Sequence, residues 1–189
     1  MASFTALYDS CVLYPAPLRD LLIRLADTGL FRARWTNAIH EEWIRNVLEN
    51  RADLSRERLE RTRDLMNEHI LDSLVNDYEE LTPTLHLPDE NDRHVLAAAI
   101  RGRADVIVTF NLKDFPEAAL SQYQIEAQHP DLFVLHLLSM DAASICVAIR
   151  KQRLDLKKPP KTAEELLDTF EEQGLKKTVA YLRPLITSL

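Results

Sequence analysis

Cysteine is scarce in this chain: Cys11 and Cys146 are the only two among 189 residues. Both lie in apolar surroundings and neither has the spacing of a zinc or redox motif, so we expect two buried, unreactive thiols and no disulfide. No apolar run approaches the roughly 18 residues that span a bilayer. The N-terminal residues also lack the basic region and apolar core of a signal peptide. These absences predict a cytoplasmic protein with no membrane segment.

Positive charge is also in short supply. Lys and Arg number 23 against 30 Asp and Glu, which gives a formal net charge of -7. This balance excludes the broad basic surface typical of proteins that bind duplex nucleic acid, and leaves only local patches such as residues 157–161. The length and a hydrophobic content of 46% suit one core of α/β size with a smaller appendage. No internal repeat or low-complexity tract is present.

Strand-like and helix-like patterns alternate through the first two thirds of the chain. This alternation predicts an α/β fold in which helices cover a parallel sheet. Short β-rich segments predict strands at residues 4–8, 31–35 and 104–110 and near residue 125. Helical spacing predicts helices at residues 18–28, 37–47, 92–101 and from 130 onward, a solvated helical hairpin over 49–64 and a loop between Pro83 and Pro88.

The end of the chain is predicted to be wholly helical. One helix is expected near residues 141–154, followed by a stiff linker at 157–161. Thr162 and Glu165 have the spacing of a capping box, and Gly174 is a suitable helix end. Pro184 is expected to cut or kink the last helix. We therefore divide the chain into a main domain, residues 1–138, and a C-terminal helical extension, residues 139–189.

Four acidic residues fall where the ends of these elements should meet. Asp9 follows the first strand, Glu42 lies in the helix capped by Thr36, Asp92 opens a helix and Asp114 follows the strand at 104–110. The carboxyl ends of parallel strands share one edge of a sheet, where ligands bind. Clustered carboxylates repel one another unless protons or a cation are present, and hard oxygen ligands favour Mg²⁺ or Mn²⁺. Metal-assisted phosphodiester hydrolysis follows as a hypothesis.

Each acid also has a purely structural interpretation. Either Asp89 or Asp92 could cap the helix that follows, Asp9 could serve a turn at the strand end, and Asp114 could belong to an Asx turn after Asn111. Glu41 and Glu42 are adjacent, and we favour Glu42 because Trp43 beside it marks the buried face. His40, His94 and His136 show no metal-binding spacing and are assigned solvated or structural roles, and Trp35 and Trp43 are assigned to the core.

Three segments together resemble a known family. They are LYDSCVLYP near the start, the helix TNAIHEEW, and the long run DENDRHVLAAAIRGRADVIVTFNLKDFP. This combination resembles the PIN domain and, within it, the VapC-like ribonuclease toxins of type II toxin–antitoxin pairs. The resemblance covers roughly residues 6–138. It implies a three-layer α/β/α fold with a central parallel sheet and a PIN-like nuclease domain at residues 1–138.

The resemblance also implies roles for individual residues. Asp9, Glu42, Asp92 and Asp114 take the catalytic positions, and Asp9, Asp92 and Asp114 are the implied ligands of Mg²⁺ or Mn²⁺. The chain departs from the family by placing Asn111 directly after the strand, where many members have an Asp, so Asp114 is expected to supply the charge. Asn111, Asp89 and Arg93 are the implied substrate or supporting residues.

The implied function is metal-dependent endoribonuclease cleavage of single-stranded RNA, which leaves a 3′-hydroxyl and a 5′-phosphate. The implied partners are an RNA substrate (tRNA, rRNA or mRNA), a cognate antitoxin and a second copy of the chain as a homodimer. One rival hypothesis is a catalytically weak RNA-binding or scaffold protein, which Asn111 would permit. Another is a phosphatase with Asp9 as nucleophile, which would require an Asp where Cys11 stands.

Overall fold

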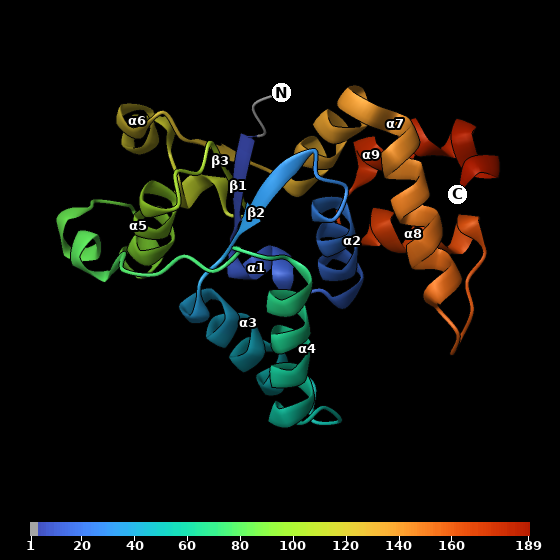
Figure 1. Ribbon diagram of the computed structural model, residues 1–189, viewed down its shortest axis with the longest axis horizontal. Coiled ribbons are helices and arrows are strands. Elements are labelled where there is room, and N and C mark those ends of the chain that lie inside the picture. Colours follow the sequence, from blue (N-terminus) through green and yellow to red (C-terminus); the bar gives the residue numbers. More distant parts are fainter. Residues whose placement is uncertain (1–3) are drawn as a thin grey trace.

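A parallel four-stranded sheet lies at the centre of the computed structural model, which describes residues 4–189. The strand order is β2-β1-β3-β4, with β1 (Phe4–Tyr8) between β2 (Phe31–Arg34) and β3 (Val106–Val108), and β4 (Glu126–Gln128) at one edge. Because all the strands are parallel, their carboxyl ends lie along the same edge of the sheet. The sheet occupies the middle of the molecule in Figure 1.

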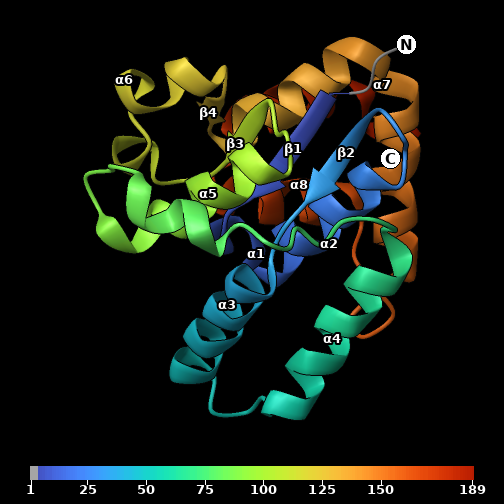
Figure 2. The same cartoon turned by 60° about the vertical axis from the view of Figure 1, so that its left-hand side comes forward.

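Helices cover both faces of this sheet. Helices α2 and α7 pack against each other on one side, whereas α5 contacts β1 and β3 from the other (Figures 1 and 2). The predicted three-layer α/β/α fold with a C-terminal helical extension is therefore confirmed. The helices are α1 (Ser10–Leu13), α2 (Ala16–Ala26), α3 (Asn37–Asn50), α4 (Arg56–His69), α5 (Arg93–Arg101), α6 (Glu117–Leu120), α7 (Pro130–Asp155), α8 (Ala163–Glu172) and α9 (Lys176–Leu182).

The expected elements differ from the observed ones mainly at their ends. Strand β3 is shorter than residues 104–110, because the backbone N–H of Ala104 still donates to the carbonyl of Ala99 at the end of α5. Pro83 lies inside a 3₁₀ helix, Glu79–Thr84, and not at the edge of a loop. The capping box is present, since the Thr162 hydroxyl accepts from the N–H of Glu165 and the Glu165 carboxylate accepts from the N–H of Thr162.

Helix α7 shows that the expectation about apolar runs was wrong. Among the described residues it is one helix that is long and apolar enough, by length and composition, to cross a membrane. Its apolar character has a structural cause, because Phe133, Leu137 and Ile149 are almost fully buried. The ring of Phe133 packs edge-on against Phe31, with centroids 5.1 Å apart. The helix is thus a core element on one face of the sheet.

The boundary between the two predicted parts falls inside α7. The predicted helix from Pro130 and the predicted helix near Asp141 are the two helical segments of α7, which meet at a kink at Asp141, where φ is -155° and ψ is 82°. The Asp141 carboxylate accepts from the backbone N–H of Ser144 at 3.0 Å and so caps the second half of the helix. The division at residues 138 and 139 stays a prediction, but no flexible linker separates its two sides.

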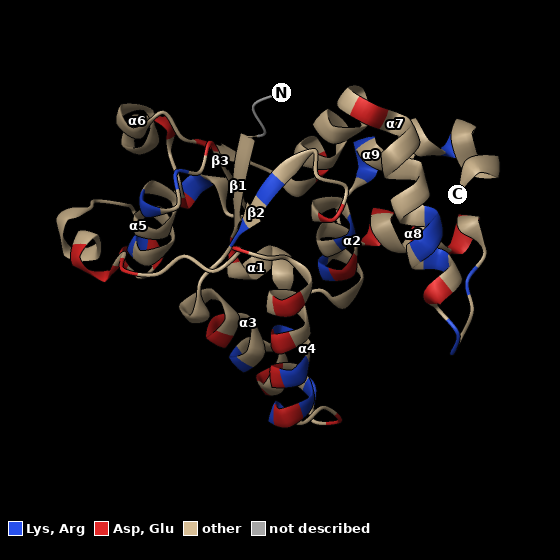
Figure 3. Cartoon of the chain, in the orientation of Figure 1, with Lys and Arg blue, Asp and Glu red and all other residues tan. Residues whose placement is uncertain are grey.

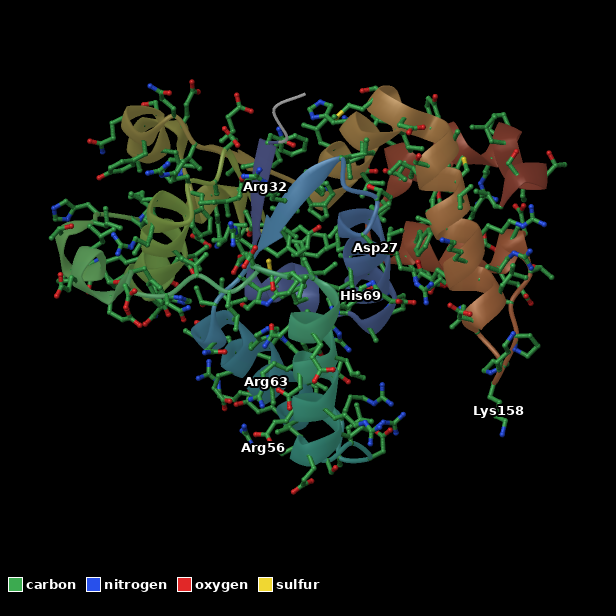
Figure 4. All side chains as sticks on the ribbon, in the orientation of Figure 1. Asp27, Arg32, Arg56, Arg63, His69 and Lys158 are labelled. Atoms are coloured by element: carbon green, nitrogen blue, oxygen red, sulfur yellow. The ribbon has the colours of Figure 1, made fainter. Side chains whose placement is uncertain are left out.

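Helices α3 and α4 form a hairpin that projects from the body, as predicted for the charged segment, although it extends over Asn37–His69 (Figure 2). Charged residues of both signs alternate along α4 (Figure 3). Arg56 bridges to Glu41 across the hairpin at 3.0 Å. The end of α4 approaches the end of α2, where His69 lies 3.5 Å from Asp27 (Figure 4).

A buried polar network fixes the base of this hairpin. The side-chain oxygen of Asn67 accepts from the indole N–H of Trp35 at 2.7 Å and lies 3.0 Å from Nε2 of His40. The indole of Trp43 donates to Nδ1 of His40 at 2.9 Å. His40 therefore carries its proton on Nε2 and is neutral, and burial lowers its pKa to about 4. The predicted structural role of His40 is confirmed.

Candidate active site

Asp9 stands at the carboxyl end of β1 and is only 2% exposed. One carboxylate oxygen accepts from the backbone N–H of Ser10 at 2.6 Å and caps the start of α1. Asp9 therefore has the structural role that was considered for it at the strand end. The other oxygen accepts from the hydroxyl of Thr109 at 2.7 Å and from the thiol of Cys11 at 3.2 Å. These three donors fix the orientation of a buried carboxylate.

Thr109 and Cys11 are connected to each other as well as to Asp9. Thr109 is fully buried at the end of β3, and its hydroxyl also accepts from the backbone N–H of Asn111 at 3.0 Å. Burial and the neighbouring charge of Asp9 raise the pKa of the Cys11 thiol to about 12. Cys11 is therefore an uncharged hydrogen-bond donor at neutral pH, which supports the prediction of an unreactive thiol. It is only partly buried, whereas Cys146 is buried as expected.

The sequence left open whether Asp89 or Asp92 caps the following helix, and the structure gives the capping role to Asp89. The carboxylate of Asp89 accepts from the N–H of Asn91 at 2.9 Å and caps the 3₁₀ turn Glu90–Asp92. Asp92 makes no capping hydrogen bond at the start of α5, so its carboxyl group is free for another use. Burial raises the pKa of Asp92 to about 6.

The charges that surround Asp92 identify its neighbours. After burial, the causes of its raised pKa are the carboxylates of Asp9, Asp89, Asp114 and Glu42, in that order. A like charge raises a carboxyl pKa only when it is close. The structure therefore brings together, around Asp92, acids from the end of β1, from α3 and from two 3₁₀ turns.

Glu42 and His94 form a pair within this group. Nε2 of His94 lies 2.7 Å from a carboxylate oxygen of Glu42, and both side chains are mostly buried. Burial alone would raise the pKa of Glu42, but the hydrogen bond and charge of His94 lower it below the usual value. Burial alone would lower the pKa of His94, but Glu42, Asp9 and Asp92 raise it. Glu41 instead bonds Arg56 at the surface, which supports the choice of Glu42.

The remaining predicted residues are more exposed to solvent than Asp9. Asp114 is half-buried in the 3₁₀ turn Leu112–Asp114, and its N–H donates to the carbonyl of Asn111 at 3.0 Å. The side chain of Asn111 is exposed and caps nothing. Arg93 is paired with Glu90, and its Nε is buried without a partner. Asn111 and Arg93 thus flank the acids without bonding to them.

The acids are coupled, but the described residues contain no group of three or more His, Cys, Asp or Glu arranged to hold a metal ion. Their chemistry nevertheless fits a hard divalent cation, because the nearest available ligands are carboxylate oxygens. Burial, followed by nearby negative charges, raises the pKa of Asp92 to about 6, and a cation at this position would relieve the repulsion from those charges. Asp9, Asp92 and Asp114 are the residues that would hold it.

Cys11, Thr109, His94 and Arg45 were not predicted as part of this site. Cys11 lies two residues after Asp9, Thr109 ends the β3 segment, and His94 lies two residues after Asp92, so each adjoins a predicted acid or the turn that presents one. Arg45 is exposed one turn after Glu42 and helps to lower the pKa of that carboxyl group. Closeness in sequence to the four acids, or to the turn that presents one, was the signal that could have identified these residues. None of them has a spacing that forms a recognisable motif.

Replacing Asp92 by Asn should stabilise the protein at neutral pH. The folded pKa of Asp92, about 6, is above its ordinary value of 3.8, so its contribution to stability is complete below pH 3.8 and is lost as the pH rises through 6. Asp92→Asn should raise the free energy of unfolding by about 1 kcal/mol at pH 7.5, a value reduced for solvent screening of a half-exposed group, and change it little at pH 4. Urea unfolding in EDTA measures this.

Asp64→Asn is the matched control, because Asp64 is an exposed acid on α4. It should change the unfolding free energy by less than about 0.5 kcal/mol at both pH values. An equal gain for Asp92→Asn at pH 4 and pH 7.5 would contradict the electrostatic explanation.

A large groove lies elsewhere on the molecule. It has a volume of about 1080 Å³ and is lined by α2, α4, α7 and α8, including Ile23, Leu65 and Val147. None of the four predicted catalytic acids lines it. The candidate site at the carboxyl edge of the sheet is therefore separate from this groove.

A parallel three-layer α/β/α domain whose strand ends carry clustered acids defines the class of this protein. The family model described as PIN domain matches residues 5–113, and the VapC50 C-terminal domain model matches residues 130–184. Since the first match covers more than half of the chain, the chain belongs to the PIN-domain family. The second match begins at the first residue of α7, so helix α7 belongs to the C-terminal match along its length.

A curated relative supports the same assignment. The protein named "Putative ribonuclease VapC50" from Mycobacterium tuberculosis (strain ATCC 25618 / H37Rv) is 50% identical over 82 residues. The match covers 43% of this chain and 48% of that protein, so the chain spans about half the length of the curated relative it matches. No solved structure matches the chain.

Proposed function

We propose that this protein is a metal-dependent endoribonuclease that cleaves single-stranded regions of RNA and acts as the toxin of a toxin–antitoxin pair. The observation that carries the proposal is the raised pKa of Asp92, which is caused first by burial and then by four other carboxylates. Membership of the PIN-domain family and the name of the relative support the nuclease assignment. An acidic cluster at the carboxyl edge of a parallel sheet is suited to binding a cation and a phosphate together.

Asp9, Asp92 and Asp114 would hold Mg²⁺ or Mn²⁺ through carboxylate oxygens. When bound, such a cation stabilises charge on the phosphate and makes a water molecule more acidic. Asp9 is the best-oriented ligand because Thr109, Cys11 and the Ser10 N–H fix its carboxylate. Asp92 would lose its remaining proton on binding, so cation affinity should fall as the pH drops below about 6.

Glu42 is the candidate for moving a proton in the reaction. Its lowered pKa keeps it ionised at neutral pH, so its carboxylate can accept a proton from the attacking water. The water oxygen would bond to phosphorus while the bond from phosphorus to O3′ breaks. O3′ then takes up a proton, which leaves a 3′-hydroxyl and a 5′-phosphate.

RNA would be held through few phosphate contacts, because the whole chain is acidic. Arg45 is exposed close to Glu42 and is the best-placed cation for a phosphate beside the scissile bond. Arg93 is less available, since Glu90 engages it. The affinity for a substrate such as tRNA, rRNA or mRNA should therefore fall only weakly with salt concentration. Each Arg or Lys that contacts the RNA neutralises about one phosphate charge, and this number sets the steepness of the fall.

A cognate antitoxin would cover the acids with a short inserted segment, and the protein would act in the cytoplasm as a homodimer. Growth arrest on induced expression, relieved by coexpression of the antitoxin, would support the partner assignment. Light scattering of the purified protein would test the dimer.

Cleavage of end-labelled RNA in Mg²⁺, Mn²⁺ or EDTA tests the catalytic assignment. We expect cleavage with either cation and none with EDTA, and products with 5′-phosphate ends. Cleavage that continues in EDTA would overturn the metal requirement. Single-stranded and fully paired versions of the same sequence test the preference for unpaired regions.

The alternative function is a catalytically weak RNA-binding or scaffold protein. One specific observation favours it: Asn111 occupies the position directly after the strand end and is exposed without a capping role. RNA binding with no cleavage in any metal would support this alternative. Restored cleavage in Asn111→Asp would then show that the missing carboxylate is the cause.

A further inference from the structure

His94 connects the two helices that flank the acidic edge. It lies in the first turn of α5, two residues after Asp92, and its Nε2 reaches a carboxylate oxygen of Glu42 on α3 at 2.7 Å. The two side chains are 17% and 27% exposed, so solvent competes only weakly for the contact. The pair joins residues that are 52 positions apart in the sequence.

The direction of this hydrogen bond follows from its chemistry. An ionised carboxylate only accepts, so Nε2 of His94 must carry the proton that lies between them. The other ring nitrogen, Nδ1, is buried and has no hydrogen-bond partner among residues 4–189. Glu42 is therefore the one hydrogen-bond partner that the described structure gives the His94 ring.

The surroundings of Glu42 explain why such a partner matters. Glu42 is close enough to Asp92 to contribute to its electrostatic environment, together with Asp9 and Asp114. A free carboxylate at this position would be drawn to any cation that the three Asp residues hold. The hydrogen bond to His94 instead holds Glu42 toward α5, and the side chain of Ser10 is a second, uncharged hydrogen-bond partner of the same carboxylate.

We propose that His94 is the positioning residue of Glu42: it keeps the Glu42 carboxylate in place to accept a proton and prevents it from closing on the cation as an extra ligand. This inference rests on the proposed nuclease function. It separates the acids by task, since Asp9, Asp92 and Asp114 hold the cation while Glu42, fixed by His94, acts on the water.

Replacing His94 by Leu gives a result that separates positioning from simple structural support. Freed from its partner, Glu42 should bind the cation, so the Kd for Mn²⁺ should fall by about fivefold. Cleavage should become slower by about 10-fold or more, because the same carboxylate is lost to proton transfer. Damage to the fold would instead weaken Mn²⁺ binding and slow cleavage together.

Two further variants complete the experiment. His94→Gln keeps a donor at about the position of Nε2 and should restore both Mn²⁺ affinity and cleavage toward the parent values. In the Glu42→Gln background, His94→Leu should change neither the Mn²⁺ affinity nor the cleavage rate further, because no carboxylate is left to release. Mn²⁺ binding is measured by isothermal titration calorimetry, and melting temperatures verify that every variant is folded.

Weaker Mn²⁺ binding by folded His94→Leu would overturn the positioning role. So would a further loss of Mn²⁺ affinity or of cleavage rate when His94→Leu is added to Glu42→Gln. The Mn²⁺ titration does not require RNA, so it distinguishes failure of the positioning role from failure of the proposed function. If the parent fails to cleave RNA while the Mn²⁺ affinities change as expected, the nuclease proposal fails and the relation between His94 and Glu42 stands.

Discussion

Asp9→Asn is expected to slow RNA cleavage by about 10³-fold or more while leaving the protein folded. Asp9 is almost fully buried at the end of the central strand, and three donors orient its carboxylate. A neutral amide removes one negative charge from the group around Asp92, so Mn²⁺ binding should also weaken. Gel analysis of end-labelled RNA and calorimetric titration with Mn²⁺ measure the two effects.

Stability distinguishes loss of chemistry from loss of fold in this variant. The amide oxygen can still accept from the Ser10 N–H, and removal of a like charge should leave Asp9→Asn as stable as the parent or more so. Asp64→Asn, an exposed acid on α4, serves again as the control and should cleave at the parent rate. Cleavage by Asp9→Asn within about 10-fold of the parent would mean that this carboxylate is not the central ligand.

Asp131→Ala should lower the free energy of unfolding by about 3 kcal/mol. Asp131 is 7% exposed in the first turn of α7, and its two carboxylate oxygens accept from the backbone N–H groups of Lys177 and Thr178 at 2.9 and 2.8 Å. Alanine leaves these buried donors at the start of α9 without a partner. Urea unfolding followed by circular dichroism measures the change.

Asp155→Asn is the matched control on the same helix. The Asp155 side chain is 65% exposed and pairs with Arg24, so its loss should cost less than about 0.5 kcal/mol. Thr178→Val removes only the hydroxyl bond to the Asp131 carbonyl, and should cost about 1 kcal/mol. A loss below about 1 kcal/mol for Asp131→Ala would show that α9 does not depend on this carboxylate.

Local patterns predicted most of the fold. Thr36 and Thr162 cap the helices expected to follow them, and Pro130 begins α7, because each signal acts within a few residues. The parallel sheet followed from alternation of strands and helices together with the resemblance, whereas the strand order was not predicted. The apolar nature of α7 was underestimated because charged residues at its two ends and Asp141 near its middle interrupt the apolar run in the sequence.

The candidate site was predictable only in part. The structure brings Asp9, Glu42, Asp92 and Asp114 into electrostatic contact, but their catalytic roles stay predictions. Their partners could not be read from the sequence, because Thr109 reaches Asp9 across 100 residues and His94 reaches Glu42 across 52. Such contacts exist only once the sheet is assembled, and neither pair has a spacing that repeats or a residue type that demands a partner.

Helix α7 holds the C-terminal helices rigidly against the rest of the molecule. Phe133 anchors its first turn to the sheet, Asp131 binds the start of α9, and Gln152 near its far end donates to the carbonyl of Pro17 on α2 at 3.0 Å. These three contacts hold the C-terminal helices in one fixed position relative to the sheet and α2.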